Sequence, residues 1–308
     1  MMFRRSFVSG LGALAISGCS GAEKPVSGTR DRPADDVLRA ALATIEREAG
    51  GRLGAFVLDT GDGRGVGHRA GERFGMCSTF KLSLAAIVFR AAEKGTLRLD
   101  ERLSFARADL VPHSPVTELH ADEGHMTVEA LAEATQITSD NTAANLLLAR
   151  LGGPAVVTAF WRELGDAGSR LDRMEPQMNF VPPGEERDTV IPEGIARSAA
   201  KITTGEVLSP ASRARLIEWM ERTETGKKRI RAGLPAGWRG ADKTGTGIAK
   251  GMPNRTNDIA LLMPPGGRAP IVVVGFMEAD GEYEDVRPGD EAALAKLGRA
   301  AVAWAAGG

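Results

Sequence analysis

The sequence of 308 residues lacks several features that would assign it to a class at once. Lys+Arg and Asp+Glu total 39 and 40, and the formal net charge of −1 excludes the basic field that nucleic-acid binding usually needs. After the N-terminus there is no apolar run long enough to span a membrane, and there is no internal repeat. These absences favour a globular protein with a small neutral or anionic ligand.

Histidine and cysteine are scarce as well. The four histidines lack the spacing of a zinc motif, so we expect no metal and no other cofactor; they are His68, His113, His120 and His125. Of the two cysteines, Cys19 lies in an expected export segment, which leaves Cys77 without a partner and predicts no disulfide. With 43% hydrophobic and 26% charged residues, the chain can build one large core, or a core with a second lobe.

Residues 1–19 are typical of an export signal, with Arg4 and Arg5 before a short apolar core. The paired arginines resemble the twin-arginine export pattern, but they also suit the general secretory route. The Ile-Ser-Gly-Cys sequence that ends at Cys19 resembles a lipoprotein processing site. It predicts a periplasmic protein that is lipid-anchored at Cys19; the alternative is cleavage near Ala22, which would release a soluble protein.

Residues 20–33, rich in Gly, Ser, Thr and Pro, predict a flexible tether before a folded domain at residues 34–308. Apolar residues at helical spacing predict amphipathic helices near the two ends of this domain, over residues 35–49 and 290–305. Strands with glycine-rich turns between them are predicted over residues 53–59, 65–74, 258–263 and 269–277.

This order of elements predicts one antiparallel sheet that is assembled from both chain ends and covered by the terminal helices. Its lobe would comprise residues 34–76 and 223–308. The mostly helical pattern of residues 77–222 predicts a second lobe, and a ligand cleft is expected between the two lobes.

Ser78 and Lys81 lie one helical turn apart in a very apolar segment. Residues 82–90 are apolar nearly all round, which predicts a buried helix. A lysine buried there would have a lowered pKa and could accept a proton from the serine, whose negative charge the helix dipole would favour. Taken alone, Ser-x-x-Lys is more often a helix cap followed by a solvated lysine.

Two further motifs supply matching chemistry. Between two apolar helical runs, Ser139 could relay a proton and Asn141 could offer an amide, although Ser-Asp-Asn alone favours a helix N-cap. Before the late strands, small residues would admit a substrate backbone while a lysine and hydroxyls bind its carboxylate. The stretch is Lys243, Thr244, Gly245, Thr246 and Gly247, and the alternative for it is a turn with an exposed lysine.

A proline-rich stretch from Arg173 to Asp188 predicts a compact loop, with these two residues paired across its neck. Within the loop, Glu175 could act as a general base on a water that Asn179 helps to position; the alternative is a solvated carboxylate. Arg229, in a basic run, faces either the ligand or solvent.

Together these motifs resemble those of class A β-lactamases. Ser-x-x-Lys, Ser-Asp-Asn and Lys-Thr-Gly occur in that family's chain order, with a Glu-Pro-x-x-Asn loop between the second and third. The resemblance runs from about residue 34 to the C-terminus. It implies an α/β fold of the α+β type, with a five-stranded antiparallel sheet covered by the N- and C-terminal helices and a helical second lobe. This is the serine β-lactamase and penicillin-binding transpeptidase-like fold.

The resemblance also implies roles for the candidate residues in hydrolysing the lactam amide of penicillins and cephalosporins, which gives antibiotic resistance. Ser78 would form the acyl-enzyme, with Lys81 or Glu175 as acylation base and Ser139 as proton relay. Backbone N–H groups of Ser78 and Thr246 would bind the oxyanion, and Glu175 with Asn179 would activate the deacylating water. Asn141 would bind the substrate amide. The substrate carboxylate would be bound by Lys243, Thr244, Thr246 and Arg229, and Gly245 is a further expected substrate-binding residue.

Some positions depart from the common family pattern. His113 replaces a wall residue that is often aromatic, so stacking on the substrate would be weaker or pH-dependent. Gly247 stands where some carbapenem-hydrolysing members have a cysteine bonded to the one before the nucleophile, which leaves carbapenem hydrolysis open. Residues 248–257 form a long connection between edge strands. The alternatives are a penicillin-binding D,D-peptidase or a non-hydrolysing lactam sensor, and a monomer is expected.

Overall fold

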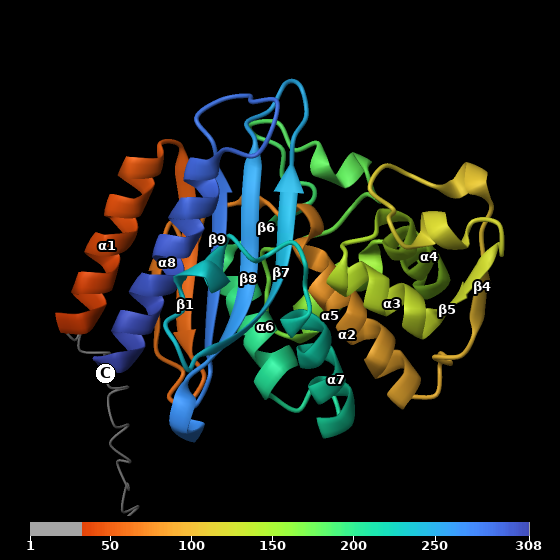
Figure 1. Cartoon of the computed structure of the whole chain (residues 1–308), viewed down its shortest axis with the longest axis horizontal. Helices are drawn as coiled ribbons and strands as arrows, with labels where there is room; N and C mark the ends of the chain where they lie inside the picture. Colours follow the sequence, from red (N-terminus) through yellow and green to blue (C-terminus); the bar gives the residue numbers. More distant parts are fainter. Residues whose placement is uncertain (1–32, 308) are drawn as a thin grey trace, which may run out of the picture. The chain divides into compact units, whose positions relative to one another are not determined.

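A five-stranded antiparallel sheet organises the part of the chain that the computed structural model describes, residues 33–307 (Figure 1). The strand order is β2-β1-β9-β8-β7, so strands from the two chain ends lie side by side, as predicted. The strands are β1 (Arg52–Asp59), β2 (Gly65–His68), β7 (Arg239–Gly247), β8 (Arg255–Met263) and β9 (Ile271–Glu278). The expected export segment, Cys19 and nearly all of the tether lie outside the described residues.

Both faces of the central strands are buried, because apolar side chains alternate between two hydrophobic clusters. In β9, Val273 faces the cluster formed with the terminal helices, while Val272 and Val274 face the helical lobe. The terminal helices α1 (Pro33–Ala49) and α8 (Pro288–Ala306) cover the first face, as predicted for this chain (Figure 1).

The remaining helices cover the other face of the sheet and form the helical lobe. They are α2 (Phe80–Glu93), α3 (Val128–Ile137), α4 (Asn141–Leu151), α5 (Ala155–Glu163), α6 (Pro192–Thr204) and α7 (Pro210–Glu221). Short 3-10 helices lie in the connections between the helices and strands of the whole domain. They are η1 (Cys77–Thr79), η2 (Arg107–Asp109), η3 (Thr117–His120), η4 (Gln177–Asn179), η5 (Ile230–Gly233) and η6 (Pro265–Gly267). Every residue of α2 from Phe80 to Phe89 is buried, and Lys81 is the one charged side chain among them.

No single helix of the described chain is long and apolar enough to cross a membrane. The neighbouring pair α4 and α5 passes the same test of length and composition together, but it is bent by 74°.

The predicted strand over residues 65–74 is wrong beyond His68. Arg69 has a φ of 46°, in the left-handed region, and this turn ends the pairing of β2 with β1. The chain then forms β3 (Phe74–Gly75), which pairs with β6 (Thr189–Val190) in a separate two-stranded sheet. A second small sheet pairs β4 (Arg102–Ser104) with β5 (His125–Thr127).

The predicted connection over residues 248–257 is shorter in the structure, because β8 already begins at Arg255. Arg255 pairs with Gly247, and Asn257 with Gly245, so the last residues of that stretch belong to the sheet. The connection therefore spans residues 248–254.

Gly298 of α8 provides a test of how closely the terminal helix packs on η5. A Cβ atom at Gly298 would lie 2.2 Å from the backbone oxygen of Ile230, whereas one at Gly289 in the same helix would meet nothing within 4 Å. We expect Gly298→Ala to lower the free energy of unfolding by about 1–3 kcal/mol through overpacking, and Gly289→Ala to lower it little or not at all. Urea unfolding measures both, and equal stabilities of the two variants would contradict this packing.

Candidate active site

A cavity of about 490 Å³ opens beside the edge strand β7 and collects residues from every predicted motif. Nine of the residues predicted from the sequence line it: Ser78, His113, Ser139, Asn141, Asn179, Arg229, Thr244, Gly245 and Thr246. Three other predicted residues, Lys81, Glu175 and Lys243, are buried close behind this lining. The structure thus brings together stretches that are far apart in the sequence.

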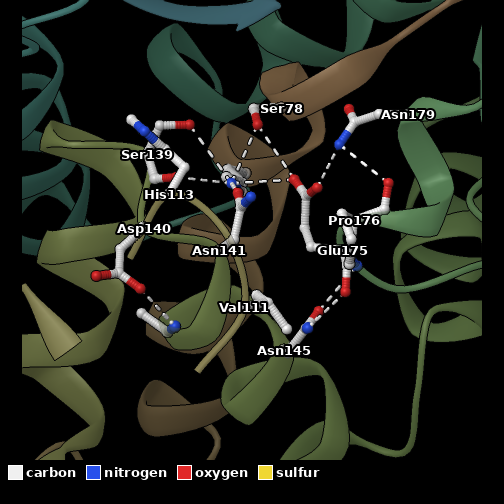
Figure 2. A network of polar contacts seen from close by, with 12 residues as sticks. Ser78, Val111, His113, Ser139, Asp140, Asn141, Asn145, Glu175, Pro176 and Asn179 are labelled. Carbon is white, nitrogen blue, oxygen red and sulfur yellow. Dashed lines mark hydrogen bonds and ion pairs between the residues drawn. The ribbon is translucent and has the colours of Figure 1, made fainter. Parts of the chain in front are cut away.

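Ser78 lies in η1, the short 3-10 helix that precedes α2. The residue before it, Cys77, has a φ of 48° and turns the chain so that Ser78 reaches the cavity. The Ser78 hydroxyl donates to Glu175 Oε1 at 3.1 Å, as Figure 2 shows, and its oxygen accepts from Lys81 Nζ at 3.0 Å. One hydroxyl therefore contacts a carboxylate and an amine at the same time.

Lys81 has a side-chain exposure of 0% and contacts polar groups from several elements. Besides Ser78, its Nζ atom donates to the Ser139 carbonyl at 2.8 Å and to Asn141 Oδ1 at 2.5 Å, and it lies 3.1 Å from Glu175 Oε1. Burial lowers the pKa of Lys81, as expected, while the Glu175 carboxylate opposes this shift.

Glu175 is held from two sides. Its backbone is fixed to α4, because the Asn145 side chain donates to the Glu175 carbonyl at 2.8 Å and accepts from its N–H at 3.0 Å. Asn179 Nδ2 donates to Glu175 Oε2 at 2.5 Å (Figure 2). The alternative of a solvated loop carboxylate is wrong, because the Glu175 side chain is fully buried.

The neck of the loop is closed by the predicted pair. Arg173 Nε lies 2.5 Å from Asp188 Oδ2, and the other carboxylate oxygen accepts from the backbone N–H groups of Asp172 and Arg173 at 2.8 and 3.0 Å. Asp188 itself is fully buried with a φ of 58°. This set of contacts fixes both ends of the loop that carries Glu175.

The Ser-Asp-Asn stretch caps a helix and also places a hydroxyl beside a buried lysine. Asp140 caps α4 by accepting from Ala143 N at 2.8 Å. Ser139, with a φ of 64°, turns away from the helix, and its hydroxyl accepts from Lys243 Nζ at 3.1 Å. Burial, followed by the nearby charge of Lys81, holds the pKa of Lys243 well below its usual value. Ser139 thus lies between two buried lysines.

Arg229 belongs to the cavity rather than to a solvated basic cluster. Lys227 and Lys228 are exposed, but Arg229 is buried and donates to the carbonyls of Gly245 and Asn257 at 2.9 and 2.8 Å. It also donates to Thr246 Oγ1 at 2.7 Å. Arg229 also lines the cavity beside this strand, so a ligand-facing role stays a prediction that its position allows.

Asn257 is a positioning residue that the sequence analysis missed. It lies opposite Gly245 in β8, is buried, and donates from Nδ2 to the carbonyls of Gly75 and Met76 at 2.9 and 3.2 Å. A Cβ on Gly245 would lie 2.7 Å from the Met76 oxygen and 3.1 Å from Ser78 N, so the strand runs tightly against the turn that carries Ser78. The available signal was the run of four polar residues, Arg255–Asp258, directly before the apolar half of the strand.

Two departures from the family pattern can be located. His113, exposed at the cavity wall with a φ of 63°, donates from Nε2 to the Thr138 carbonyl at 3.0 Å. Gly247 faces Cys77, since a Cβ there would lie 2.7 Å from the Cys77 sulfur. Burial raises the pKa of the Cys77 thiol to about 12, so the thiol is unreactive at neutral pH.

Within residues 33–307, no group of three or more His, Cys, Asp or Glu side chains could hold a metal ion. Cys77 is the one cysteine of this range. The absence of a cofactor and of a disulfide stays a prediction.

Comparison with known proteins decides the family. The model of the Beta-lactamase enzyme family matches residues 37–305. Beta-lactamase L2 of Stenotrophomonas maltophilia is 46% identical over 271 residues, which are 87% of each chain. An ancestral Gram-negative class A β-lactamase structure has a TM-score of 0.80 and 49% identity, over 86% of this chain and 99% of its own. This chain belongs to the class A β-lactamase family.

Further class A relatives agree with this assignment. Beta-lactamase OXY-2 of Klebsiella oxytoca is 43% identical over 85% of this chain and 88% of its own length. The crystal structure of a β-lactamase from Burkholderia vietnamiensis has a TM-score of 0.81 and 45% identity, over 91% of this chain and 99% of its own. The assignment makes the enzyme a serine β-lactamase, a hydrolase that opens β-lactams and confers antibiotic resistance, and it confirms the predicted fold class.

The contribution of Asn257 to activity and stability can be tested with the adjacent residue Thr256 as a control. We expect Asn257→Ala to lower kcat/KM and to reduce the free energy of unfolding by about 1–3 kcal/mol, because the Gly75 and Met76 carbonyls each lose a buried donor. Thr256→Val is the matched control, since the Thr256 hydroxyl is buried without a partner among the described residues. Urea unfolding and initial rates measure both effects. An Asn257→Ala enzyme with the parent's kcat/KM would show that Asn257 does not position the nucleophile.

Proposed function

We propose that the β-lactamase opens penicillins and cephalosporins through an acyl-enzyme on Ser78. The observation that supports it most is the position of the Ser78 hydroxyl, 3.0 Å from Lys81 Nζ and 3.1 Å from Glu175 Oε1 at the cavity wall. Such a hydroxyl can lose its proton as its oxygen attacks the lactam carbonyl. The Ser78–carbonyl bond forms, and the carbon–nitrogen bond of the strained ring breaks.

Either Lys81 or Glu175 takes the serine proton in this proposal. Both lie within hydrogen-bond distance of Ser78 Oγ, which is the first requirement for a general base. The lowered pKa of Lys81 increases its neutral, proton-accepting fraction at neutral pH. The Glu175 carboxylate can accept the proton directly, because Oε1 already accepts a hydrogen bond from the Ser78 hydroxyl.

The proton then has a short route to the departing lactam nitrogen through Ser139. The Ser139 hydroxyl lies 3.4 Å from Lys81 Nζ and 3.1 Å from Lys243 Nζ. It can donate its proton to the nitrogen and regain one from a lysine. The developing oxyanion is assigned to the backbone N–H groups of Ser78 and Thr246, which the close approach of Gly245 to Ser78 N supports.

Deacylation is assigned to Glu175 with Asn179. Asn179 holds the Glu175 carboxylate at 2.5 Å and also lines the cavity, so a water beside both side chains could be activated to attack the acyl carbonyl. The water proton passes to Glu175, the bond between the acyl carbon and the Ser78 oxygen breaks, and Glu175 returns the proton to Ser78 as the product acid is released. Turnover depends on this second step.

Substrate binding is assigned to the strand side of the cavity. Lys243, Thr244, Thr246 and Arg229 bind the substrate carboxylate, and Gly245 leaves room for its backbone. Asn141 binds the amide side chain of the substrate with a single free N–H, because its oxygen accepts from Lys81 and its nitrogen already donates to Pro112 O at 2.8 Å.

We also propose the lobe division and the cellular location predicted from the sequence. The sheet lobe comprises residues 34–76 and 223–308, the helical lobe residues 77–222, and the enzyme is a monomer. Class A enzymes are typically exported, which supports export to the periplasm. The lipid anchor on Cys19 rests on the Ile-Ser-Gly-Cys sequence alone. The mass of the native N-terminus tests the anchor, since an unmodified start beyond Cys19 would contradict it.

Two substitutions separate the steps of the proposed reaction. We expect Ser78→Ala to abolish hydrolysis and Glu175→Ala to lower kcat by about 10²–10⁴-fold while an acyl adduct accumulates. Glu186→Ala is the matched control, because its side chain lies in the same loop but is 65% exposed. Intact mass spectrometry during cephalosporin hydrolysis measures the adduct. Wild-type turnover by Glu175→Ala would refute its role in deacylation.

The lowered pKa of Lys243 predicts that kcat/KM depends on pH for substrates that carry a carboxylate, and not for neutral ones. As pH rises through this pKa, Lys243 loses its positive charge and with it the attraction for the substrate carboxylate. The kcat/KM ratio of a penicillin to its methyl ester should therefore fall toward alkaline pH, since the ester carries no carboxylate. Initial rates across the pH range give this ratio, and a constant ratio would mean that Lys243 does not bind the carboxylate as a cation.

A further inference from the structure

A second hollow, of about 530 Å³, lies at the base of the loop that carries Glu175 and shares no lining residue with the active-site cavity. Three arginines line it, together with one carboxylate, that of Asp172. Small residues such as Ala155, Ala159 and Gly168 make up much of the remaining wall. The described reaction uses none of these residues. The arginines are Arg73, Arg162 and Arg170.

Two of these arginines use only some of their N–H groups in hydrogen bonds within the protein. Arg162 uses Nη1 to donate to the carbonyls of Asp166 and Ser169. Arg73 uses its Nη1 to donate to Gly168 O at 2.8 Å and Thr189 Oγ1 at 3.1 Å. In the described chain, Nη2 of both arginines and Nε of Arg162 have no hydrogen-bond partner. Each guanidinium is thus fixed on one side and available on another.

Three guanidinium groups and one carboxylate line the hollow, and the buried Asp166 carboxylate lies beside it. Arg170 is paired with Asp172, through contacts of 2.8 and 2.5 Å, and its Nη1 has no partner among residues 33–307. Glu186 is 65% exposed and lies 3.9 Å from Arg73 Nε, so it neutralises Arg73 weakly. The Asp166 carboxylate accepts from the backbone N–H groups of Gly168 and Ser169 and makes no ion pair with the three arginines in the described structure. The remaining charge of Arg162 has no carboxylate partner in the described structure.

We propose that this hollow binds a phosphate group, either free or on a small organic molecule. Guanidinium forks match the oxygens of phosphate, and here their remaining N–H groups come from three separate chain segments. The volume of about 530 Å³ lies within the range of small-molecule sites, so an organic phosphate also fits.

A bound phosphate would tie the two ends of the loop together. Arg170 and Asp172 precede the loop's closing pair, while Arg73 reaches Thr189 just after it. A ligand held by Arg73 and Arg170 therefore bridges both ends of the neck and restrains the loop. This inference does not depend on the role proposed for Glu175.

Thermal unfolding of the full chain tests binding, with inorganic phosphate and glycerol 3-phosphate as probes at constant ionic strength. We expect Tm to rise by about 3 °C at a probe concentration of about ten times Kd. Equal shifts with both probes mean that the phosphate group alone is bound, and a larger shift with the ester identifies an organic phosphate. No shift with either probe would overturn the proposal.

Two single substitutions locate the site. Arg73→Gln and Arg170→Gln should each weaken the phosphate Kd about tenfold or more, because each removes charged donors. Arg98→Gln is the matched control, since Arg98 is an exposed arginine that pairs with Asp100 and does not line the hollow. An unchanged Kd in both test variants would refute the site, and should one of them fail to fold, the other decides.

Hydrogen exchange tests the restraint on the loop without any substitution. Saturating phosphate should slow amide exchange over residues 170–189 in the wild-type enzyme, while exchange around Arg98 stays the same. Crystals soaked in sodium selenate should show an anomalous selenium peak among the three arginines. Unchanged exchange in the loop, or an empty hollow in the soaked crystal, would contradict the proposal.

Discussion

The buried pair of Lys81 and Glu175 is the interaction on which the rest of the site depends. Both side chains are fully buried, with Nζ and Oε1 3.1 Å apart, and two charges removed from water are costly unless other hydrogen bonds compensate. Those bonds come from Ser139 just before α4, from Asn141 at its first position, and from Asn179 in the loop. The helical lobe, the loop and the nucleophile turn therefore have to meet around one pair, and Ser78 is held where they meet.

Residues with a strained, left-handed backbone are concentrated around the same site. Five non-glycine residues of the described chain have a positive φ, and four of them border the site: Cys77, His113, Ser139 and Asp188. Each left-handed residue costs free energy, so surrounding contacts must fix it. Asp188 is fixed by Arg173 and two backbone N–H groups, while Ser139 is followed by the capping residue Asp140. The strain is thus located where side chains must be aimed at the substrate.

Much of this arrangement could be predicted from the sequence, because apolar spacing identified α1, α3, α4 and α8, and ordered motifs identified the cavity residues. The local sequence pattern could not predict tertiary contacts, which join residues far apart in the chain. Arg229 differs from the exposed Lys228 only through packing, and Asn257 finds its partner Gly75 at a separation of 182 residues. The break after His68 comes at one left-handed residue, Arg69, inside the predicted strand.

The central claim is that one buried network both forms the acyl-enzyme and releases it. The most direct test is hydrolysis of a chromogenic cephalosporin by the purified wild-type enzyme, with intact mass recorded during the reaction. We predict sustained turnover and no lasting adduct, because Glu175 contacts Ser78 directly and is in place for the second step. A single stoichiometric burst that leaves a stable acyl adduct on Ser78 would contradict this account.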